Sequence, residues 1–242
     1  MKRAFDIVFS FLGMVVISPV LIPAIVAIWL QDFHSPFYVS TRLGKNGRPF
    51  KMVKLRSMKL DADNSGVFST TSNDPRVTRV GRMARKYKLD ELPQGWHVFN
   101  GDMSFVGPRP QIPYGVKDYT EKEKELFEVR PGITDFSSII FADESDVLKN
   151  SKDPNVDYDL LIRPWKSRLG LFYIEKQSFI LDIVLMALTL VGIFSRDSAL
   201  KGGTYVLSKL DANQDLINIS KRNQPLQPHS PPGLTETTHP SK

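Results

Sequence analysis

The first 30 residues contain a long stretch without charge. From Ile7 to Leu30 every side chain is uncharged, and valine, isoleucine, leucine, phenylalanine and tryptophan predominate. A helix needs about 20 apolar residues to cross a bilayer core, so this pattern predicts a helix that enters lipid. A cleaved signal peptide is the first alternative, because Lys2 and Arg3 form a basic start. The apolar run exceeds the roughly 7 to 15 residues of a signal peptide, and Asp6 lies at its edge, which favours a permanent membrane segment.

Basic residues flank this apolar stretch on both sides, so the positive-inside rule places both of its ends on the cytoplasmic face. Ser18 and Pro19 lie midway along the run, and a proline interrupts a helix because it lacks an amide donor and clashes with the preceding turn. We therefore predict a re-entrant membrane hairpin over residues 1–36, in which the Ser18 hydroxyl satisfies a freed carbonyl. A kinked but spanning helix stays the alternative, since membrane helices tolerate proline. The flanking basic residues on the C-terminal side are Arg42, Lys45, Arg48, Lys51, Lys54, Arg56 and Lys59.

The next part of the chain predicts a hairpin, a loop and a basic helix. Residues 37–58 alternate apolar and basic positions around two glycines, which is typical of two short strands joined by a turn. Residues 61–75 are rich in Asp, Asn, Ser, Thr and Gly and predict a loop. Residues 76–89 have helical spacing with arginine and lysine on one face, so this amphipathic helix can lie in water or contact anionic lipid headgroups.

The C-terminal half predicts further helices and a polar tail. Residues 169–194 are apolar but interrupted by charge, and their longest uncharged run is too short to span a membrane, so we expect a core or interfacial helix. Residues 201–242 are polar and rich in proline near the end, which predicts a partly disordered tail. The predicted domain division is a membrane hairpin at 1–36, a catalytic domain at 37–200 and the tail at 201–242.

Composition narrows the partners and the chemistry. The chain has 242 residues, 41% of them hydrophobic, and no cysteine, which excludes disulfides, thiolate metal sites and thiol nucleophiles. A net charge of +6 and a pI near 9.4 favour anionic partners: nucleic acid, acidic lipid headgroups or phosphorylated small molecules. Charge alone does not choose among these three.

Candidate chemistry lies where the basic helix ends. Asp90 and Glu91 are adjacent carboxylates that can bind a divalent metal or act as an oxygen nucleophile. Arg85 precedes them, and Arg109 lies in a stiff Gly-Pro-Arg-Pro turn at residues 107–110; both can bind phosphate oxygens. An isolated Asp-Glu pair is most often a polar surface turn, so the cations around this pair decide the interpretation. The cluster indicates chemistry on a phosphate ester.

An ordered series of motifs over about residues 1–195 resembles the bacterial sugar transferase family, specifically the small monotopic phosphoglycosyl transferases that begin lipid-linked glycan assembly. The motifs are Lys2-Arg3 with Asp6, Ser18-Pro19, Arg42-Leu-Gly with Gly47, Lys54-Leu-Arg56-Ser-Met, Asp74-Pro-Arg76, Leu89-Asp-Glu-Leu-Pro-Gln94, Gly101-Asp-Met-Ser-Phe-Val-Gly-Pro-Arg-Pro110 and Pro131-Gly-Ile-Thr134.

This resemblance implies an α+β, mainly helical fold: a re-entrant membrane helix-break-helix plus a cytosol-facing domain with interfacial amphipathic helices and a small sheet. It implies transfer of a sugar-1-phosphate from a nucleotide sugar, usually a UDP-sugar, to polyprenyl phosphate (undecaprenyl phosphate), with release of UMP. Asp90 matches the nucleophile that forms a phosphosugar-aspartyl intermediate, and Glu91 with Asp90 matches the Mg²⁺ site. Arg85, Arg109, Lys54 and Arg56 are the expected phosphate ligands. The expected location is the bacterial inner (cytoplasmic) membrane, with the catalytic domain on the cytoplasmic face.

Two departures from the family pattern leave the donor sugar open: the segments Asp135–Ile140 and Leu169–Tyr173 differ from the usual sequences. A membrane-tethered scaffold without chemistry is the competing function. Nucleic-acid binding is disfavoured because no recognition module is present. A homodimer is left open.

Overall fold

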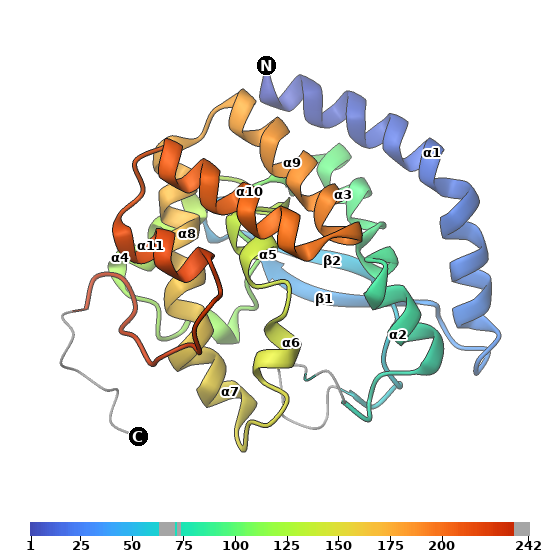
Figure 1. The fold of residues 1–242 in the computed structure, drawn as a ribbon. Coiled ribbons are helices and arrows are strands. Elements are labelled where there is room, and N and C mark those ends of the chain that lie inside the picture. Colours follow the sequence, from blue (N-terminus) through green and yellow to red (C-terminus); the bar gives the residue numbers. More distant parts are fainter. Residues whose placement is uncertain (63–70, 72–73, 235–242) are drawn as a thin grey trace.

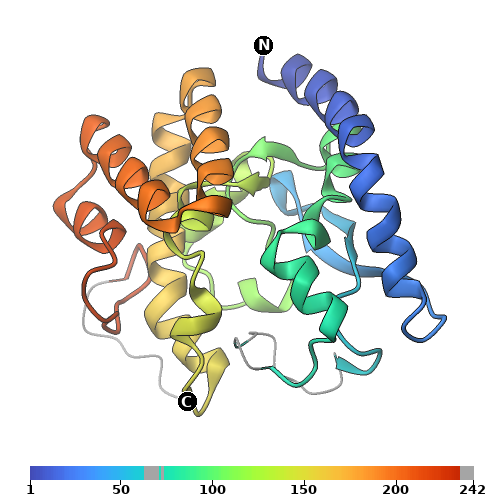
Figure 2. The same ribbon diagram turned by 45° about the vertical axis from the view of Figure 1, so that its right-hand side comes forward.

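The computed structural model describes residues 1–62, 71 and 74–234, and it is mainly helical with two small sheets (Figure 1). The long helix α1 (Lys2–Trp29) runs along one side of the molecule, and the C-terminal helices stack on the other. The rotated view of Figure 2 shows α1 and the C-terminal helices on opposite sides of the molecule. The remaining longer helices are α2 (Arg79–Lys86), α3 (Gln94–Asn100), α8 (Arg163–Lys176), α9 (Phe179–Phe194), α10 (Arg196–Lys209) and α11 (Gln214–Ser220). The short ones are η1 (Lys45–Gly47), η3 (Leu89–Glu91), η4 (Tyr114–Val116), α4 (Glu121–Lys124), η5 (Glu125–Glu128), α5 (Phe136–Ile140), α6 (Glu144–Val147), α7 (Pro154–Asp157) and η6 (Tyr158–Ile162).

The hairpin of two short strands that was predicted over residues 37–58 is confirmed. Strands β1 (Phe37–Leu43) and β2 (Pro49–Leu55) pair antiparallel around the expected glycine-containing turn. Met52 from β2 packs with Val98 and Met103 in a small apolar cluster under the hairpin. This cluster fixes the hairpin against α3, so the side chains of β2 keep a set position relative to the residues before α3.

A second, parallel pair joins two motifs that are distant in the chain. Strand β3 (Ser104–Val106) pairs with β4 (Gly132–Thr134). The backbones then approach so closely that a Cβ added at Gly132 would lie 2.1 Å from the Gly107 nitrogen. Glycine is therefore required at this crossing, and the Gly-Pro-Arg-Pro turn is held beside Pro131-Gly132.

The main core lies among α5, α8, α9, α10 and α11. Its fully buried side chains include Phe136, Leu169, Tyr173, Leu185 and Leu207. Helix α9 contributes its inner face to this core, while Ile180, Leu190 and Phe194 on its other face are exposed. Among the described residues, α1 is the one helix long and apolar enough to cross a membrane, and α9 is a shorter apolar helix, as the sequence predicted.

Helix α1 corrects the predicted helix-break-helix. Lys2–Trp29 is one continuous helix of 28 residues that includes Pro19 and Pro23, and its axis bends along its length (Figure 1). Pro19 has no amide hydrogen to donate to the Val15 carbonyl; the Ser18 hydroxyl donates to that carbonyl instead, at 2.7 Å. The expected role of Ser18 is therefore confirmed, and this local repair explains why the helix bends without breaking.

The beginning of α1 is fixed to the rest of the protein. Lys2 Nζ donates to the Asp182 carboxylate at 2.6 Å, and to the Tyr173 hydroxyl and the Val106 carbonyl at 2.9 Å each. Asp6 is buried and accepts from the Phe105 amide at 3.3 Å. Burial raises the pKa of Asp6, although hydrogen bonds and the nearby cations act in the opposite direction. The family motif at residues 2–6 thus anchors α1 on β3 and α9.

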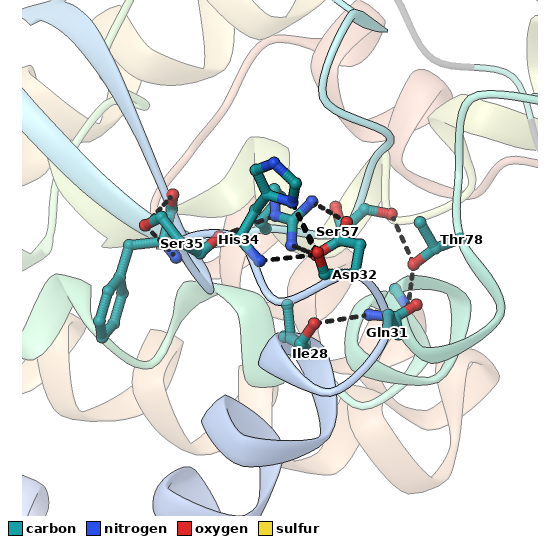
Figure 3. A network of polar contacts seen from close by, with 10 residues as sticks. Ile28, Gln31, Asp32, His34, Ser35, Ser57 and Thr78 are labelled. Atoms are coloured by element: carbon teal, nitrogen blue, oxygen red, sulfur yellow. Dashed lines mark hydrogen bonds and ion pairs between the residues drawn. The ribbon is translucent and has the colours of Figure 1, made fainter.

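The end of α1 is fixed to the same body. Ile28 is fully buried, and the Arg56 guanidinium binds both oxygens of Asp32 at 2.6 Å. Figure 3 shows this junction, in which the His34 amide also donates to Asp32 and the Gln31 side chain reaches back to the Ile28 carbonyl. The middle of α1 is exposed and apolar, with Val16 75% exposed. Both ends of the apolar helix therefore contact one compact domain.

The first part of the predicted tail is helical. Helices α10 and α11 extend to Ser220, and residues 221–234 then run back along α8; residues 235–242 lie outside the described part. The His229 amide donates to the Leu160 carbonyl at 3.0 Å, and its ring contacts Trp165 edge to face at 4.4 Å between centroids. In a regular α-helix the amide of residue 164 would donate to the Leu160 carbonyl, but Pro164 has no amide hydrogen. The His229 amide donates there instead.

Candidate functional site

A sharp backbone turn presents the carboxylate pair. Helix α2 is capped by Thr78, whose hydroxyl accepts from the Gly81 amide at 2.9 Å, and it ends at Lys86. Lys88 then adopts a left-handed conformation with φ of 57°, which is costly for a residue with a side chain. The chain continues directly into η3, which contains Asp90 and Glu91. The pair therefore lies just after the end of the basic helix, as predicted.

Glu91 is held by two cations from different parts of the chain: Lys54 on β2 and Arg109 in the turn after β3. Its Oε1 accepts from Lys54 Nζ at 3.1 Å, and it also accepts from the Arg109 guanidinium. Burial alone would raise the pKa of Glu91, but Arg109 and Lys54 outweigh it and hold that pKa well below its usual range. Glu91 is therefore ionised at every physiological pH, and it fixes Lys54 and Arg109 around it.

Asp90 has the opposite environment. Asp90 is 9% exposed, and in the described part of the chain no hydrogen bond or ion pair involves its carboxylate. Burial, followed by the negative charge of Glu91, raises the pKa of Asp90, while Lys54 and Arg85 only partly oppose this rise. Its oxygens are thus free of protein donors, and a carboxylate with unoccupied lone pairs in a dry setting is suited to nucleophilic attack.

Three cations line a small cavity beside Glu91. Arg42, Lys54 and Arg109 enclose a cavity of about 50 Å³ together with Met52, Gln94, Pro110 and Gly132. Arg42 makes no ion pair with a carboxylate in the described residues; its donors reach the Pro110 carbonyl at 3.4 Å and the Ser40 hydroxyl at 3.3 Å. Burial and then the nearby Arg109 lower the pKa of Arg42 to about 10. An excess of buried positive charge marks a place for an anion.

Arg42 lines the cavity, although the sequence did not single it out as a phosphate ligand. It was recognised only as part of the Arg42-Leu-Gly motif, because on the sequence it stands 48 positions before Asp90. Its position on β1 follows from the hairpin register, in which Arg42 faces Phe50. The cavity itself depends on the contact between Leu43 and Gln111, whose backbones bond at 2.9 Å. This long-range contact has no local signal in the sequence.

The two remaining predicted phosphate ligands, Arg85 and Arg56, have different surroundings. Arg85 donates from Nε to the Ser57 hydroxyl at 2.8 Å and lies in the electrostatic field of Asp90. Arg56 instead has its own carboxylate, Asp32, and it is not among the residues that line the cavity. Arg56 therefore secures the end of α1. Ser18 and Pro19 lie within α1 and not at the cavity.

A histidine connects β2, which contains Lys54, to the turn before β3, the strand that precedes Arg109. His97 is buried; its Nε2 accepts from the Val53 amide at 3.0 Å, and its Nδ1 lies 3.1 Å from the Asp102 carboxylate. Accepting at Nε2 requires the proton on Nδ1, which is the nitrogen that faces Asp102. His97 thus holds β2 next to the turn before β3, and Asp102 has a structural role.

The carboxylate pair can contribute to a metal site but cannot complete one. No group of three or more His, Cys, Asp or Glu side chains that could hold a metal ion exists among the described residues. Within that part of the chain, Glu91 Oε2 and both Asp90 oxygens have no bonded partner. Mg²⁺ commonly uses one or two carboxylates and takes its other ligands from phosphates and water. The donor set therefore fits Mg²⁺ that arrives with a phosphorylated substrate.

Comparisons with known proteins show which proteins the chain is similar to. The family model described as bacterial sugar transferase matches residues 1–196. A Bacillus subtilis (strain 168) protein named "Putative undecaprenyl-phosphate N-acetylgalactosaminyl 1-phosphate transferase" is 43% identical over 55% of this chain and 70% of its own length. The UDP-glucose:undecaprenyl-phosphate glucose-1-phosphate transferase of Escherichia coli (strain K12) is 40% identical over 68% of this chain, which spans 36% of that protein. A UDP-galactose-lipid carrier transferase of Erwinia amylovora is 33% identical over 82% of this chain, which spans 41% of that protein.

Proposed function

The chain belongs to the bacterial sugar transferase family, and from this premise we propose that it transfers a sugar-1-phosphate from a UDP-sugar to undecaprenyl phosphate at the cytoplasmic face of the membrane. The products are UMP and an undecaprenyl-diphosphate sugar, the first lipid-linked intermediate of a glycan. The relatives name glucose, galactose and N-acetylgalactosamine, so they leave the donor sugar open.

The observation that carries this proposal is the contrast between the two carboxylates. Glu91 is bound by cations, while the adjacent Asp90 is buried and has no hydrogen-bond or ion-pair partner among the residues that the structure describes. In the proposed reaction an Asp90 oxygen attacks the β-phosphorus, the bond from that phosphorus to the bridging oxygen breaks, and UMP leaves with the bonding electrons. An oxygen of undecaprenyl phosphate then attacks the same phosphorus and releases Asp90. Two transfers through a carboxylate replace one difficult step.

The cations make this attack electrostatically possible. An ionised Asp90 and a diphosphate repel each other, and Arg42, Lys54 and Arg109 around the cavity offset that repulsion. Arginine binds two phosphate oxygens at once, which also orients the phosphate. Asp90 and Glu91 would hold Mg²⁺, which supplies further neutralisation of the phosphate charge when it is bound.

The docking of α1 supports a re-entrant membrane placement. Both of its ends are bonded to the same domain, through Lys2 and Asp182 at one end and through Asp32 and Arg56 at the other. A helix that crossed the bilayer would carry its two ends to opposite faces. The exposed apolar middle of α1 would enter lipid, while the domain and its carboxylate pair stay at the surface that a soluble nucleotide sugar and a lipid phosphate can both reach.

Cysteine labelling tests this placement, and the chain has no cysteine of its own to interfere. Cysteines introduced singly at Met1 and Ser35 are both expected to resist a membrane-impermeant thiol reagent in intact cells and to react after lysis. Replacing Ser18 and Pro19 together with leucine is expected to straighten α1 and expose one of the two positions. Labelling of position 1 from outside in the unaltered background would contradict the re-entrant placement.

The function is tested with purified full-length protein, Mg²⁺, undecaprenyl phosphate and a panel of UDP-sugars. UMP is expected to appear only when a suitable donor is present, and the lipid product is expected to contain one phosphate more than the acceptor. A membrane-tethered scaffold would release no UMP with any donor. Release of UDP instead of UMP would exclude sugar-1-phosphate transfer, since it would mean that the sugar alone is moved.

Lys54 is expected to set part of the pH dependence. Asp90 must be ionised to attack, so activity falls as the pH drops through its pKa; Lys54 lowers that pKa against the effect of burial and Glu91. Lys54→Met should therefore move the acidic limb of the kcat/KM profile to higher pH. Lys51→Met is the matched control, because Lys51 lies on the same strand but is exposed and bonds Thr41. A lower rate with an unmoved acidic limb would show that Lys54 acts only on substrate binding.

A further inference from the structure

A second group of polar side chains lies beside the cationic cavity, and the proposed reaction does not use it. It consists of Glu144 on α6, Tyr158 on η6 and Lys166 on α8, and we call it the polar wall. Lys166 forms an ion pair with Glu144, and its Nζ lies 5.4 Å from the centre of the Tyr158 ring. The side chains of Lys166 and Glu144 are 15% and 29% exposed. The wall is thus preorganised and still accessible from one side.

The polar wall adjoins Arg109 and Arg42. The pKa of Arg109 is raised mainly by Glu91 and, among the other carboxylates, by Glu144. Burial and Arg109 lower the pKa of Arg42, and Tyr158 is among the groups that raise it. The geometry of α8 gives the same placement, because a Cβ added at Gly170 would lie 3.5 Å from the Pro108 side chain, and Lys166 is one helical turn before Gly170 on the same face. The wall therefore lies beside the turn that carries Arg109.

Tyr158 occupies an unusual backbone position. Residues Tyr158–Ile162 form a π-helical turn, a rare conformation that often occurs at functional sites. Pro164 explains the irregularity, since it leaves the Leu160 carbonyl without its helical donor and the His229 amide supplies the bond at 3.0 Å. The Tyr158 hydroxyl makes no hydrogen bond within the described part of the chain, although the residue is half-buried. This hydroxyl is available to a ligand.

The charges of the two sides match the two parts of a nucleotide sugar. Arg42, Lys54 and Arg109 give the cavity an excess of positive charge that suits phosphates, whereas the paired Glu144 and Lys166 are together neutral. A neutral wall of carboxylate, ammonium, hydroxyl and aromatic ring suits sugar hydroxyls and the apolar face of a sugar ring.

We propose that the polar wall binds the sugar of the donor and selects among donor sugars. This inference rests on the proposed function, because it requires the reacting phosphate at Arg109. The sugar is bonded directly to that phosphate, while the uracil base lies one phosphate and one ribose further away. A wall next to Arg109 is therefore placed for the sugar and not for the base.

Equilibrium binding by the full-length protein tests the wall independently of turnover. The wild type is expected to bind at least one of UDP-glucose, UDP-galactose and UDP-N-acetylgalactosamine about tenfold or more tightly than UDP. The double variant Glu144→Gln with Lys166→Met keeps the wall neutral and should lose most of this preference while its affinity for UDP stays within about twofold. Tyr158→Phe keeps the ring and is expected to reduce the preference by about threefold to tenfold. Asp146→Asn, an exposed change on the same helix, should alter neither affinity.

The outcomes separate this inference from the proposed function. Loss of UDP affinity together with an unchanged ratio among sugars would place the uridine at the wall and overturn the inference. Equal binding of UDP and all three UDP-sugars by the wild type would also overturn it. Absence of UMP release by the wild type, measured separately, would contradict the proposed function even if the wall discriminates sugars. Tyr158→Phe keeps the test decisive should the double variant fail to fold.

Discussion

Asp90→Asn is expected to abolish transfer without weakening the fold. Asparagine has the shape of aspartate but cannot attack phosphorus as an anion, so the rate of UMP release should fall at least about a thousandfold. Burial raises the pKa of Asp90, which means that its charge destabilises the folded state at pH values above that pKa and ceases to do so once it is protonated. The substitution removes this cost, so Tm at neutral pH should be unchanged or higher. Single-turnover UMP release and thermal unfolding measure the two effects.

Intact-protein mass gives a direct control for the nucleophile. Wild-type protein incubated with a UDP-sugar and no lipid acceptor should gain the mass of one sugar phosphate, whereas Asp90→Asn should gain none. The exposed Asp197 on α10 provides a matched substitution, and Asp197→Asn should keep both the adduct and the rate. UMP release that survives in Asp90→Asn would refute the assignment of the nucleophile.

The parts of the site that sequence could predict are those with a local cause. The apolar run defines α1, glycines mark the turn of the β1–β2 hairpin, and the extent of the basic helix places Asp90 and Glu91 just after its end. Each of these follows from a few consecutive residues. The resemblance then supplied the roles that local pattern could not.

The parts that sequence missed depend on contacts between distant segments. The β3–β4 pair joins residues 28 positions apart and carries Arg109 to Glu91, and the cavity further requires Arg42 from β1. Arg56 stands among basic residues in the sequence, yet its partner is Asp32, 24 residues earlier. Periodicity reports which face of an element is apolar, but it does not report which element covers that face.

The prediction of a broken membrane helix was wrong for a physical reason that the structure makes visible. Proline at position 19 removes one hydrogen bond, and the adjacent Ser18 hydroxyl satisfies the affected carbonyl of Val15. The helix can then bend without ending, because the Val15 carbonyl keeps a hydrogen-bond donor. The C-terminal segment shows the same principle, since the carbonyl that Pro164 leaves unserved is bonded by His229 from far along the chain.

Glu91→Gln is expected to impair both stability and activity, unlike Asp90→Asn. Glu91 compensates the charges of Lys54 and Arg109, and glutamine would leave both cations without a partner. Breaking one side of a buried ion pair typically costs about 3–5 kcal/mol, so Tm should fall by roughly 10 °C for a domain of this size. Transfer should fall at least about a hundredfold, and the Mg²⁺ concentration needed for half-maximal activity should rise, because one of the two candidate carboxylates is lost.

The pH dependence of stability gives the sharpest check on Glu91. Arg109 and Lys54 hold its pKa well below the value of an unfolded glutamate despite its burial. Its stabilising effect is therefore fully present above the unfolded pKa and is lost as the pH falls through the folded one, so the Tm difference between wild type and Glu91→Gln should narrow on acidification. Glu125→Gln removes an exposed pair with Lys122 at 2.8 Å and should change Tm by less than about 3 °C. Equal losses in the two variants would mean that Glu91 is no more deeply coupled than a surface carboxylate, and the account of the cationic cavity would then fail.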